Sequence, residues 1–352
     1  MNPAPFSSLS LRPELLSSTK ALGYVLMTPV QEQTLPHLLN GKDLIAQART
    51  GSGKTAAFAI GLLNKLEAQS YTTQALVLCP TRELADQVAA EVRRLASTIP
   101  NIKLLTLCGG KPMGPQLASL QRNPHIVVGT PGRILKHLDK EALHLDAIET
   151  LVLDEADRML DMGFHDDIMR IITKTADLKQ TLMFSATYPD GIKKISDILQ
   201  SDPVDIRVEF SHHSPDIDQV FFKVEKSERV KTLFKVIGYY QPESSLVFCN
   251  TKQQCDELAN ELRQHDLHAL ALHGDLEQFE RDQVLTQFAG KSSSILIATD
   301  VAARGLDVKE LAAVINFELS NDPEVHIHRI GRTARAGNKG LAVSLFTDSE
   351  KL

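Results

Sequence analysis

Short apolar runs alternate along the first half of the chain with longer stretches that have a helical pattern. Within residues 83–97, the apolar side chains recur at steps of three and four residues, which is the spacing of one helix face. The apolar runs between such stretches are unbroken and rich in Val, Ile and Leu, as is typical of parallel strands covered on both faces. They lie at residues 43–48, 75–79, 125–129, 150–154 and 181–187. The first half therefore predicts an α/β lobe built around a parallel sheet.

The same alternation resumes in the second half after a polar interruption. Residues 209–217 are polar and contain Ser-Pro, so we interpret them as a linker between one lobe at 1–208 and another at 218–352. The later apolar runs lie at residues 219–224, 245–249, 269–272, 294–300, 312–317 and 340–346. The predicted fold is thus two tandem α/β lobes, each with a parallel sheet. Ligands of such sheets bind at the carboxyl ends of the strands, so we expect a site in the cleft between the lobes.

Composition and charge limit the classes of function. The net charge is −6, yet the first 208 residues are neutral, and the whole surplus of acid lies beyond them. A passive nucleic-acid binder usually presents a basic field, so any nucleic acid must be held by local geometry or only in a particular state. No apolar run is long enough for a membrane span. The four cysteines lack metal-type spacing, so we expect core residues, a reducing compartment and a cytoplasmic protein.

The string ARTGSGKT at residues 48–55 follows a predicted strand and opens a helix. Small residues there let backbone N–H groups close around phosphate oxygens, and the helix dipole favours anions. Lys54 is expected to reach the β- and γ-phosphates, and the Thr55 hydroxyl to hold Mg²⁺. Ala48 stands where the general phosphate-loop pattern has Gly, but the strand–loop–helix context supports the assignment over a plain turn. The predicted loop ligands are Thr50, Gly51, Ser52, Gly53, Lys54 and Thr55.

Two further charged clusters allow a structural or a chemical interpretation. Asp154 and Glu155 directly follow an apolar strand, where acids often cap a helix. Beside a phosphate loop, Asp154 instead suits Mg²⁺, and Glu155 suits orienting or deprotonating the attacking water. The arginines at 329, 332 and 335 could form a solvated helix face or stabilise the negative charge of phosphoryl transfer.

These motifs occur in the order and approximate spacing of DEAD-box RNA helicases, which the chain resembles over essentially its whole length. The matching strings are ARTGSGKT, PTRELA at 80–85, TPGR at 130–133, the literal DEAD at 154–157, SAT at 185–187 and HRIGRTAR at 328–335. The resemblance implies two tandem RecA-like lobes that use ATP and Mg²⁺ to clamp RNA and unwind it locally. Because the expected hydrolytic residues lie on both lobes, hydrolysis would require lobe closure.

Roles for individual residues are implied by this resemblance. Gln31 would read the adenine edge, Tyr24 would stack on its ring, and Asp307 would hold a ribose hydroxyl. Arg332 and Arg335 would act as arginine fingers, which completes a catalytic set with Lys54 and Glu155. The residues expected to couple nucleotide state to RNA are Ser185, Thr187 and His328. The expected RNA contacts, mostly to the sugar–phosphate backbone, are Pro80, Thr81, Arg82, Gly110, Thr130, Arg133, Asn250, Gly274, Gln278, Arg281 and Thr299.

The stretches at 73–89 and 322–338 look closest to a bacterial branch of large-ribosomal-subunit assembly, whose members carry an extra C-terminal RNA-binding domain. We expect a chain that ends at Leu352 to lack that domain and to have a truncated second lobe. The expected partner is RNA, ribosomal RNA by the same resemblance, and the expected state is a monomer. The alternatives are an ATP-gated RNA clamp without efficient turnover, against which the intact hydrolytic set speaks, and a DNA translocase, against which Gln31 and the DEAD string speak.

Overall fold

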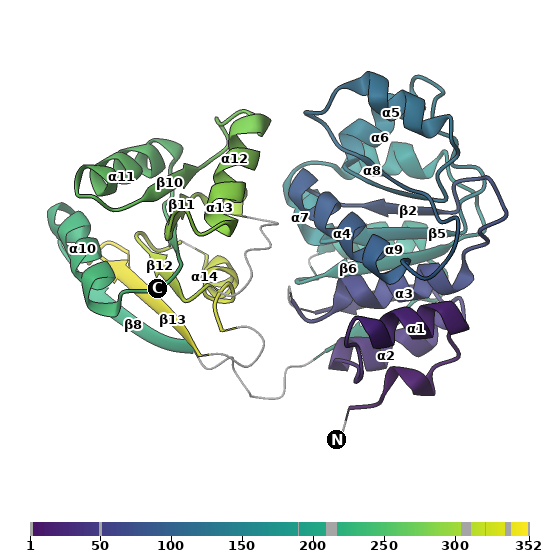
Figure 1. Ribbon diagram of the computed structural model, residues 1–352, viewed down its shortest axis with the longest axis horizontal. Coiled ribbons are helices and arrows are strands. Elements are labelled where there is room, and N and C mark those ends of the chain that lie inside the picture. The colour runs from purple at the N-terminus through teal and green to yellow at the C-terminus, as the bar shows by residue number, and fades with distance from the viewer. Residues whose placement is uncertain are drawn as a thin grey trace. The chain divides into compact units, whose positions relative to one another are not determined.

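The computed structural model divides the chain into two compact units, residues 1–209 and 210–352, and each is described by itself (Figure 1). The structure describes residues 3–48, 51–188, 190–208, 217–303, 311–320, 322–334 and 339–350. Of the predicted linker, only Ile217 lies within these ranges. It begins a strand, so that strand starts two residues earlier than the predicted 219.

Seven described strands form the sheet of the first unit. Their order is β3-β4-β2-β5-β6-β1-β7, and every pairing is parallel, which confirms the prediction. The strands β3 and β7 at the two edges were not predicted. The bounds are β1 (Leu44–Gln47), β2 (Ala75–Leu78), β3 (Leu104–Leu107), β4 (Ile126–Gly129), β5 (Thr150–Asp154), β6 (Gln180–Ser185) and β7 (Val204–Arg207).

Helices cover both faces of this sheet. One buried cluster packs α1 to α4 against one face, and another packs α6 to α9 against the other. The predicted helical face of 83–97 is confirmed, since Leu84, Val88 and Val92 of α4 are all buried. The bounds are η1 (Phe6–Ser8), α1 (Pro13–Ala21), α2 (Pro29–Leu39), α3 (Lys54–Lys65), α4 (Arg82–Leu95), α5 (Met113–Leu120), α6 (Pro131–Leu138), α7 (Ala156–Asp161), α8 (His165–Ile172) and α9 (Asp190–Leu199).

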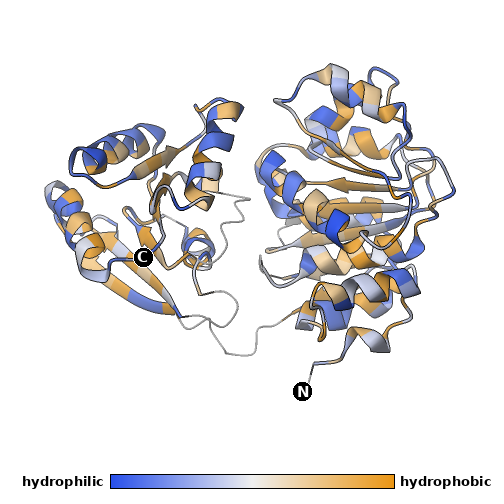
Figure 2. Cartoon of the chain, viewed as in Figure 1, coloured by the Kyte–Doolittle hydropathy of each residue, from blue (hydrophilic) through white to orange (hydrophobic). Residues whose placement is uncertain are grey.

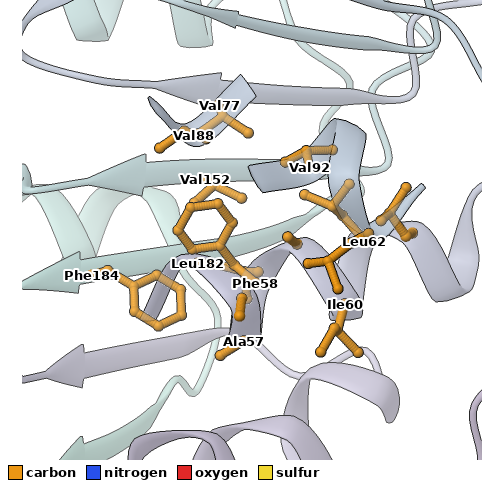
Figure 3. Close-up of a cluster of buried hydrophobic side chains, with 14 of the residues drawn as sticks. Ala57, Phe58, Ile60, Leu62, Val77, Val88, Val92, Val152, Leu182 and Phe184 are labelled. Carbon is orange, nitrogen blue, oxygen red and sulfur yellow. The ribbon is translucent and has the colours of Figure 1, made fainter. Parts of the chain in front are cut away.

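The helix α3, which begins at Lys54, is fixed by the core beneath it. Phe58 lies against Phe184 of β6, with ring centroids 5.3 Å apart, and both rings are fully buried (Figure 3). Val152 of β5 and Leu182 of β6 complete this floor. Because a close-packed core resists displacement, the packing holds the start of α3 at a set position above the strand ends.

The second unit repeats the same architecture with six described strands. The order is β10-β11-β9-β12-β13-β8, all parallel, with α10 and α11 on one face and α12 and α13 on the other. Apolar strands lie inside each unit beneath helices with polar outer sides (Figure 2). The bounds are β8 (Ile217–Lys223), η2 (Lys226–Glu228), α10 (Arg229–Tyr240), β9 (Ser245–Phe248), α11 (Lys252–Gln264), β10 (Ala269–Leu272), α12 (Gln278–Ala289), β11 (Ile295–Ala298), α13 (Asp300–Ala303), β12 (Ala313–Asn316), α14 (Pro323–Ile330) and β13 (Gly340–Phe346). None of the helices within the described ranges has the length and apolar character that a membrane crossing needs.

Candidate active site and nucleic-acid interface

Apart from Tyr24 and Gln31, the predicted site residues of the first unit lie at or just after the carboxyl ends of six neighbouring strands. In the order β3-β4-β2-β5-β6-β1, the predicted RNA contacts follow the ends of β3, β4 and β2. The phosphate loop and the DEAD and SAT strings follow β1, β5 and β6. Because parallel strands all end at the same edge, the two sets occupy adjacent halves of one surface. They meet where β2 lies beside β5.

Lys54 connects the two described ends of the phosphate loop. The ammonium group of Lys54 is buried and donates a hydrogen bond of 2.8 Å to the carbonyl of Ala48. Gly53 has a φ of +99°, and a Cβ there would lie 2.6 Å from Nε2 of Gln31, so only glycine fits. Thr55 follows in the first turn of α3. Of the predicted loop ligands, Thr50 lies outside the described residues.

Gln31 of α2 connects the predicted adenine site to this loop. Its Oε1 accepts a hydrogen bond from the backbone N–H of Thr28 at 2.9 Å, and its Nε2 donates to the carbonyl of Gly53 at 3.1 Å. A side-chain amide has two N–H donors and two acceptor lone pairs, so one donor and one lone pair remain after these bonds. The sequence alone did not indicate that Gln31 also stabilises the phosphate loop.

Tyr24, the other predicted adenine contact, is half-buried beside Phe6, with ring centroids 6.0 Å apart. Its hydroxyl donates a hydrogen bond to the carboxylate of Glu91. Burial, followed by that hydrogen bond and the charge of Glu91, raises the pKa of Tyr24 to about 12. The hydroxyl is therefore neutral and anchored at physiological pH, which fixes the position of the ring.

Asp154 ends β5 as a deeply buried carboxyl group, 3% exposed. Burial raises its pKa to about 7, while the nearby Lys54 ammonium opposes that shift and the Glu155 carboxylate adds to it. Glu155 has a φ of +52°, a conformation that is uncommon without glycine and is concentrated at functional sites. Its Oε2 accepts a hydrogen bond of 2.7 Å from Arg158, so Oε1 is the oxygen that a water molecule could approach.

Asp157, the last residue of the DEAD string, joins the string to SAT and was not among the predicted site residues. Its Oδ2 accepts hydrogen bonds from the backbone N–H groups of Ala186 (3.2 Å) and Thr187 (2.9 Å) and from the Thr187 hydroxyl (2.9 Å). The Ser185 hydroxyl accepts a bond of 3.4 Å from the backbone N–H of Asp157. Although burial raises the pKa of Asp157, the bonds from Thr187 and Ser185 outweigh it, so the net pKa lies below the ordinary value.

Some predicted RNA contacts of the first unit already have partners within the protein. The Thr81 hydroxyl caps α4 by accepting a bond of 3.2 Å from the N–H of Leu84. Arg133 donates to the carbonyl of Lys111 at 3.0 Å and to Oε1 of Gln116 at 2.9 Å. Gly110 has a φ of +77° and is exposed. Pro80, Arg82 and Thr130 stand at the same strand ends.

The predicted RNA contacts of the second unit also lie at neighbouring strand ends. Gly274, Thr299 and Asn250 follow β10, β11 and β9, which are adjacent in the sheet. Gln278 and Arg281 lie in the first turn of α12, where Arg281 donates a bond of 3.4 Å to the carbonyl of His273. Within each unit, the described candidate RNA positions thus lie at the ends of neighbouring strands.

The arginine-rich string is divided between described and undescribed residues. His328 and Arg329 end α14, and Arg332 is buried just after it. Arg329 is 2% exposed and forms a bidentate ion pair with Asp300, in which both N–O distances are 2.7 Å. Arg329 is therefore a structural anchor here, not part of a solvated face. Arg335 and Asp307, the other predicted nucleotide contacts, lie outside the described residues.

Comparisons with known proteins agree with this geometry. Residues 28–195 match the profile of the DEAD/DEAH box helicase family, and residues 225–337 match that of the helicase conserved C-terminal domain. The ATP-dependent RNA helicase DbpA of Escherichia coli is 55% identical over 98% of this chain and 76% of its own length, which confirms the expected bacterial branch. The DEAD-box ATP-dependent RNA helicase CshA of Bacillus cereus is 43% identical over 98% of this chain and 66% of its own.

Solved structures give the same result. Saccharomyces cerevisiae Dbp5 bound to RNA and ADP BeF3 matches with a TM-score of 0.88 and 31% identity, over 98% of this chain and 90% of that chain. A DEAD box protein from Methanococcus jannaschii matches with a TM-score of 0.58 and 40% identity, over 99% of this chain and 95% of that chain. Both similarities extend across the two units.

Proposed function

Because this chain belongs to the DEAD-box family of ATP-dependent RNA helicases, we propose that its two units clamp RNA and locally separate a duplex as ATP is hydrolysed. The observation that carries this proposal is the order of the strand ends in the first unit. There the candidate RNA positions and the candidate nucleotide positions share one edge and meet between β2 and β5. A change at one set can therefore reach the other through directly neighbouring strands.

In this proposal, the first unit holds the triphosphate. The backbone N–H groups of residues 51–53 and the ammonium group of Lys54 bind phosphate oxygens. In that role, Lys54 exchanges its bond to the carbonyl of Ala48 for a phosphate, so the structure keeps the ammonium group ordered in advance. Gln31 and Tyr24 bind adenine, Gln31 with the donor and lone pair that its protein contacts leave over.

Thr55 and Asp154 would hold Mg²⁺. A hydroxyl and a carboxylate are the oxygen ligands that this ion prefers, and it usually takes only one or two carboxylates and adds phosphates and water. Burial of Asp154 also favours a cation, because an unpaired carboxylate there is costly. Bound Mg²⁺ would neutralise charge that develops on the phosphates.

The hydrolytic step depends on the protein's own acid–base and cationic groups. Glu155 orients the attacking water through Oε1 and accepts its proton. Arg332 and Arg335 of the second unit stabilise the negative charge of the transferring phosphoryl group. We propose that Asp307 holds the ribose and that Ser185, Thr187 and His328 relay nucleotide state to RNA, with the contacts of Asp157 to SAT in support.

The RNA grip is proposed to act on the sugar–phosphate backbone. The candidate positions include glycines, threonines and arginines at strand ends and helix starts, which suit phosphate and 2′-hydroxyl contacts more than base readout. We further propose a ribosomal RNA target, a role in large-subunit assembly, a monomeric state and a cytoplasmic location. The first two rest on the similarity to E. coli DbpA and the others on the sequence.

Steady-state ATPase measurements with no nucleic acid, single-stranded RNA and single-stranded DNA test the proposal. We expect strong stimulation by RNA and little by DNA. Equal stimulation by DNA would favour a DNA translocase. Bound ATP that is not hydrolysed even with RNA would favour the clamp without turnover.

A further inference from the structure

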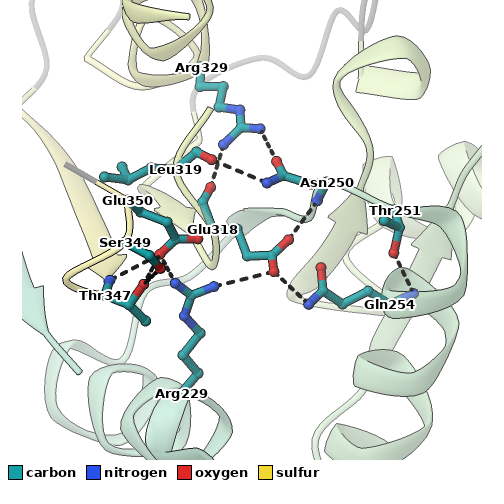
Figure 4. Close-up of polar contacts among 10 residues, drawn as sticks. All are labelled: Arg229, Asn250, Thr251, Gln254, Glu318, Leu319, Arg329, Thr347, Ser349 and Glu350. Atoms are coloured by element: carbon teal, nitrogen blue, oxygen red, sulfur yellow. Dashed lines mark hydrogen bonds and ion pairs between the residues drawn. The ribbon is translucent and has the colours of Figure 1, made fainter. Parts of the chain in front are cut away.

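Glu318 of the second unit was not among the predicted site residues, yet three segments of that unit converge on its carboxylate. It stands just after β12, with its side chain largely buried. Its Oε2 accepts a bond of 3.2 Å from the backbone N–H of Asn250, and its Oε1 one of 3.0 Å from Nε2 of Gln254. Arg229 of α10 lies 3.3 Å from the same Oε1 (Figure 4). Glu318 therefore holds the loop after β9 and the start of α11.

Asn250 is the candidate RNA contact of that loop. Both the oxygen and the nitrogen of its side-chain amide form hydrogen bonds within the protein. Its Oδ1 accepts a bond of 3.0 Å from Arg329, and its Nδ2 donates one of 3.2 Å to the carbonyl of Leu319. The backbone carbonyl of Glu318 in turn accepts a bond of 2.6 Å from Arg329 (Figure 4). Glu318, Asn250 and Arg329 thus form a closed ring of hydrogen bonds, so none of them can move without stretching a bond to another.

Arg329 belongs both to this ring of hydrogen bonds and to the arginine-rich string. It is clamped by Asp300 with two bonds of 2.7 Å, and it lies in the last turn of α14, three residues before Arg332. Tilting the Asn250 loop therefore displaces the end of α14. Holding the loop fixes the backbone from which the proposed finger Arg332 extends.

A purely structural role for Glu318 must be separated from this one. Arg229 is 3% exposed, and it is compensated by the carboxylates of Glu318 and Glu350. Removing one carboxylate from a buried guanidinium destabilises the fold whatever else that carboxylate does. A test must therefore remove the charge of Arg229 as well.

We propose that Glu318 is a positioning residue for RNA-stimulated ATP hydrolysis. It holds the Asn250 loop against Arg329, so that RNA bound at Asn250 and the finger-bearing end of α14 are kept in one fixed arrangement. This inference rests on the proposed function, because it assigns Asn250 to RNA and Arg332 to ATP.

The first variant is Glu318→Gln, which keeps the size of the side chain. The glutamine amide has one acceptor oxygen and one NH₂ group, whereas the carboxylate has two acceptor oxygens. In one orientation the NH₂ group faces the backbone N–H of Asn250, and in the other it faces Gln254 and Arg229. Donors therefore face each other in either case. We expect the RNA concentration for half-maximal ATPase to rise about tenfold, the factor that corresponds to losing one hydrogen bond to a charged group. The ATP concentration for half-maximal rate should change by less than about twofold, because the residues proposed to bind adenine and the triphosphate lie in the first unit.

The matched control is Glu257→Gln in α11. Glu257 is an exposed carboxylate of the same unit whose Oε1 accepts a bond of 2.7 Å from Gln253, and it touches neither Asn250 nor Arg229. The RNA concentration for half-maximal ATPase of the Glu257→Gln variant, its RNA half-saturation, should equal that of the parent. The second variant, Arg229→Met with Glu318→Gln, removes the guanidinium that Glu318→Gln leaves with only one of its two carboxylates. It should recover thermal stability relative to Glu318→Gln but keep the weakened RNA response.

The outcomes separate the alternatives. A raised RNA half-saturation in both Glu318→Gln and the double variant, with the control unchanged, supports the positioning role. Parental RNA half-saturation in Glu318→Gln, or its recovery in the double variant, would overturn it, because only compensation of Arg229 would then be needed. If the parent itself shows no RNA-stimulated ATPase activity, the proposed function is wrong. Because this measurement needs no variant, failure of the proposed function is distinguished from failure of the role of Glu318.

Discussion

Replacing Asp157 by asparagine tests the link between the DEAD and SAT strings. The carboxylate uses both oxygens: Oδ2 takes three hydrogen bonds from residues 186 and 187, and Oδ1 takes one of 3.0 Å from the N–H of Arg158. An asparagine amide has one acceptor oxygen and one NH₂ group. The NH₂ group therefore faces either the donors of residues 186 and 187 or the N–H of Arg158, depending on its orientation. Asp157→Asn therefore breaks part of the network while leaving the shape of the side chain unchanged.

The magnitude follows from the lost bonds. Asp157 is buried, and a hydrogen bond to a charged group contributes about 1.5–3 kcal/mol, so we expect the free energy of unfolding of the first unit to fall by about 2–3 kcal/mol. Urea denaturation at pH 7 measures this change. Duplex unwinding per ATP hydrolysed should also fall, because Thr187 is no longer fixed to the helix that follows Glu155. Asp161→Asn, in the same helix but exposed, is the control and should match the parent in both assays.

The dependence on pH gives an independent check. The pKa of Asp157 is lower in the fold than its ordinary value of 3.8, so its stabilisation is complete above that value and is lost as pH falls through the folded pKa. The difference between parent and Asp157→Asn should therefore be constant near neutral pH and shrink below about pH 4. Equal denaturation midpoints at pH 7, together with unchanged unwinding per ATP, would refute the reasoning.

Three further substitutions test the proposed nucleotide chemistry. Glu155→Gln should abolish turnover but keep ATP-dependent RNA binding, because an amide cannot accept the proton; normal ATPase rates would exclude Glu155 as the base. Gln31→Ala should reduce discrimination between ATP and GTP and, through loss of the bond to Gly53, weaken binding of both; competition binding measures the two effects. Arg335→Ala should lower kcat by several orders of magnitude with little change in nucleotide affinity; an unchanged kcat at saturating ATP and RNA would count against the finger.

The central strands could be predicted because they are continuous apolar runs. β2, β4, β9 and β11 are buried at every position, and a sequence pattern records burial directly. The edge strands β3 and β7 were missed, since one side of each is not covered by a neighbouring strand and their residues are largely half-buried or exposed. β7 alternates apolar and charged residues, which does not distinguish it from a loop, whereas β3 is an apolar run that is only four residues long.

The site was predictable where its chemistry lies in one short string. The loop around Lys54 and the acids after β5 are local, and their position at strand ends follows from the order of strand and helix. The contacts of Gln31 with Gly53, Asp157 with Thr187 and Glu318 with Asn250 join segments that are distant in sequence. No periodicity encodes such pairings, because they depend on which strands become neighbours in the sheet.

Three carboxylates beside the candidate RNA positions of the second unit do not contribute to its surplus of acid, because each is paired with a cation. Carboxylates beside the candidate RNA positions are occupied by cations of the same unit: Asp300 by Arg329, Glu318 by Arg229 and Asp275 by Lys252. A carboxylate neutralised at 2.5–3.3 Å repels a phosphate far less than a free one does. Net charge therefore misjudges the local field at these strand ends. The negative net charge therefore does not argue against the proposed RNA contacts at these positions.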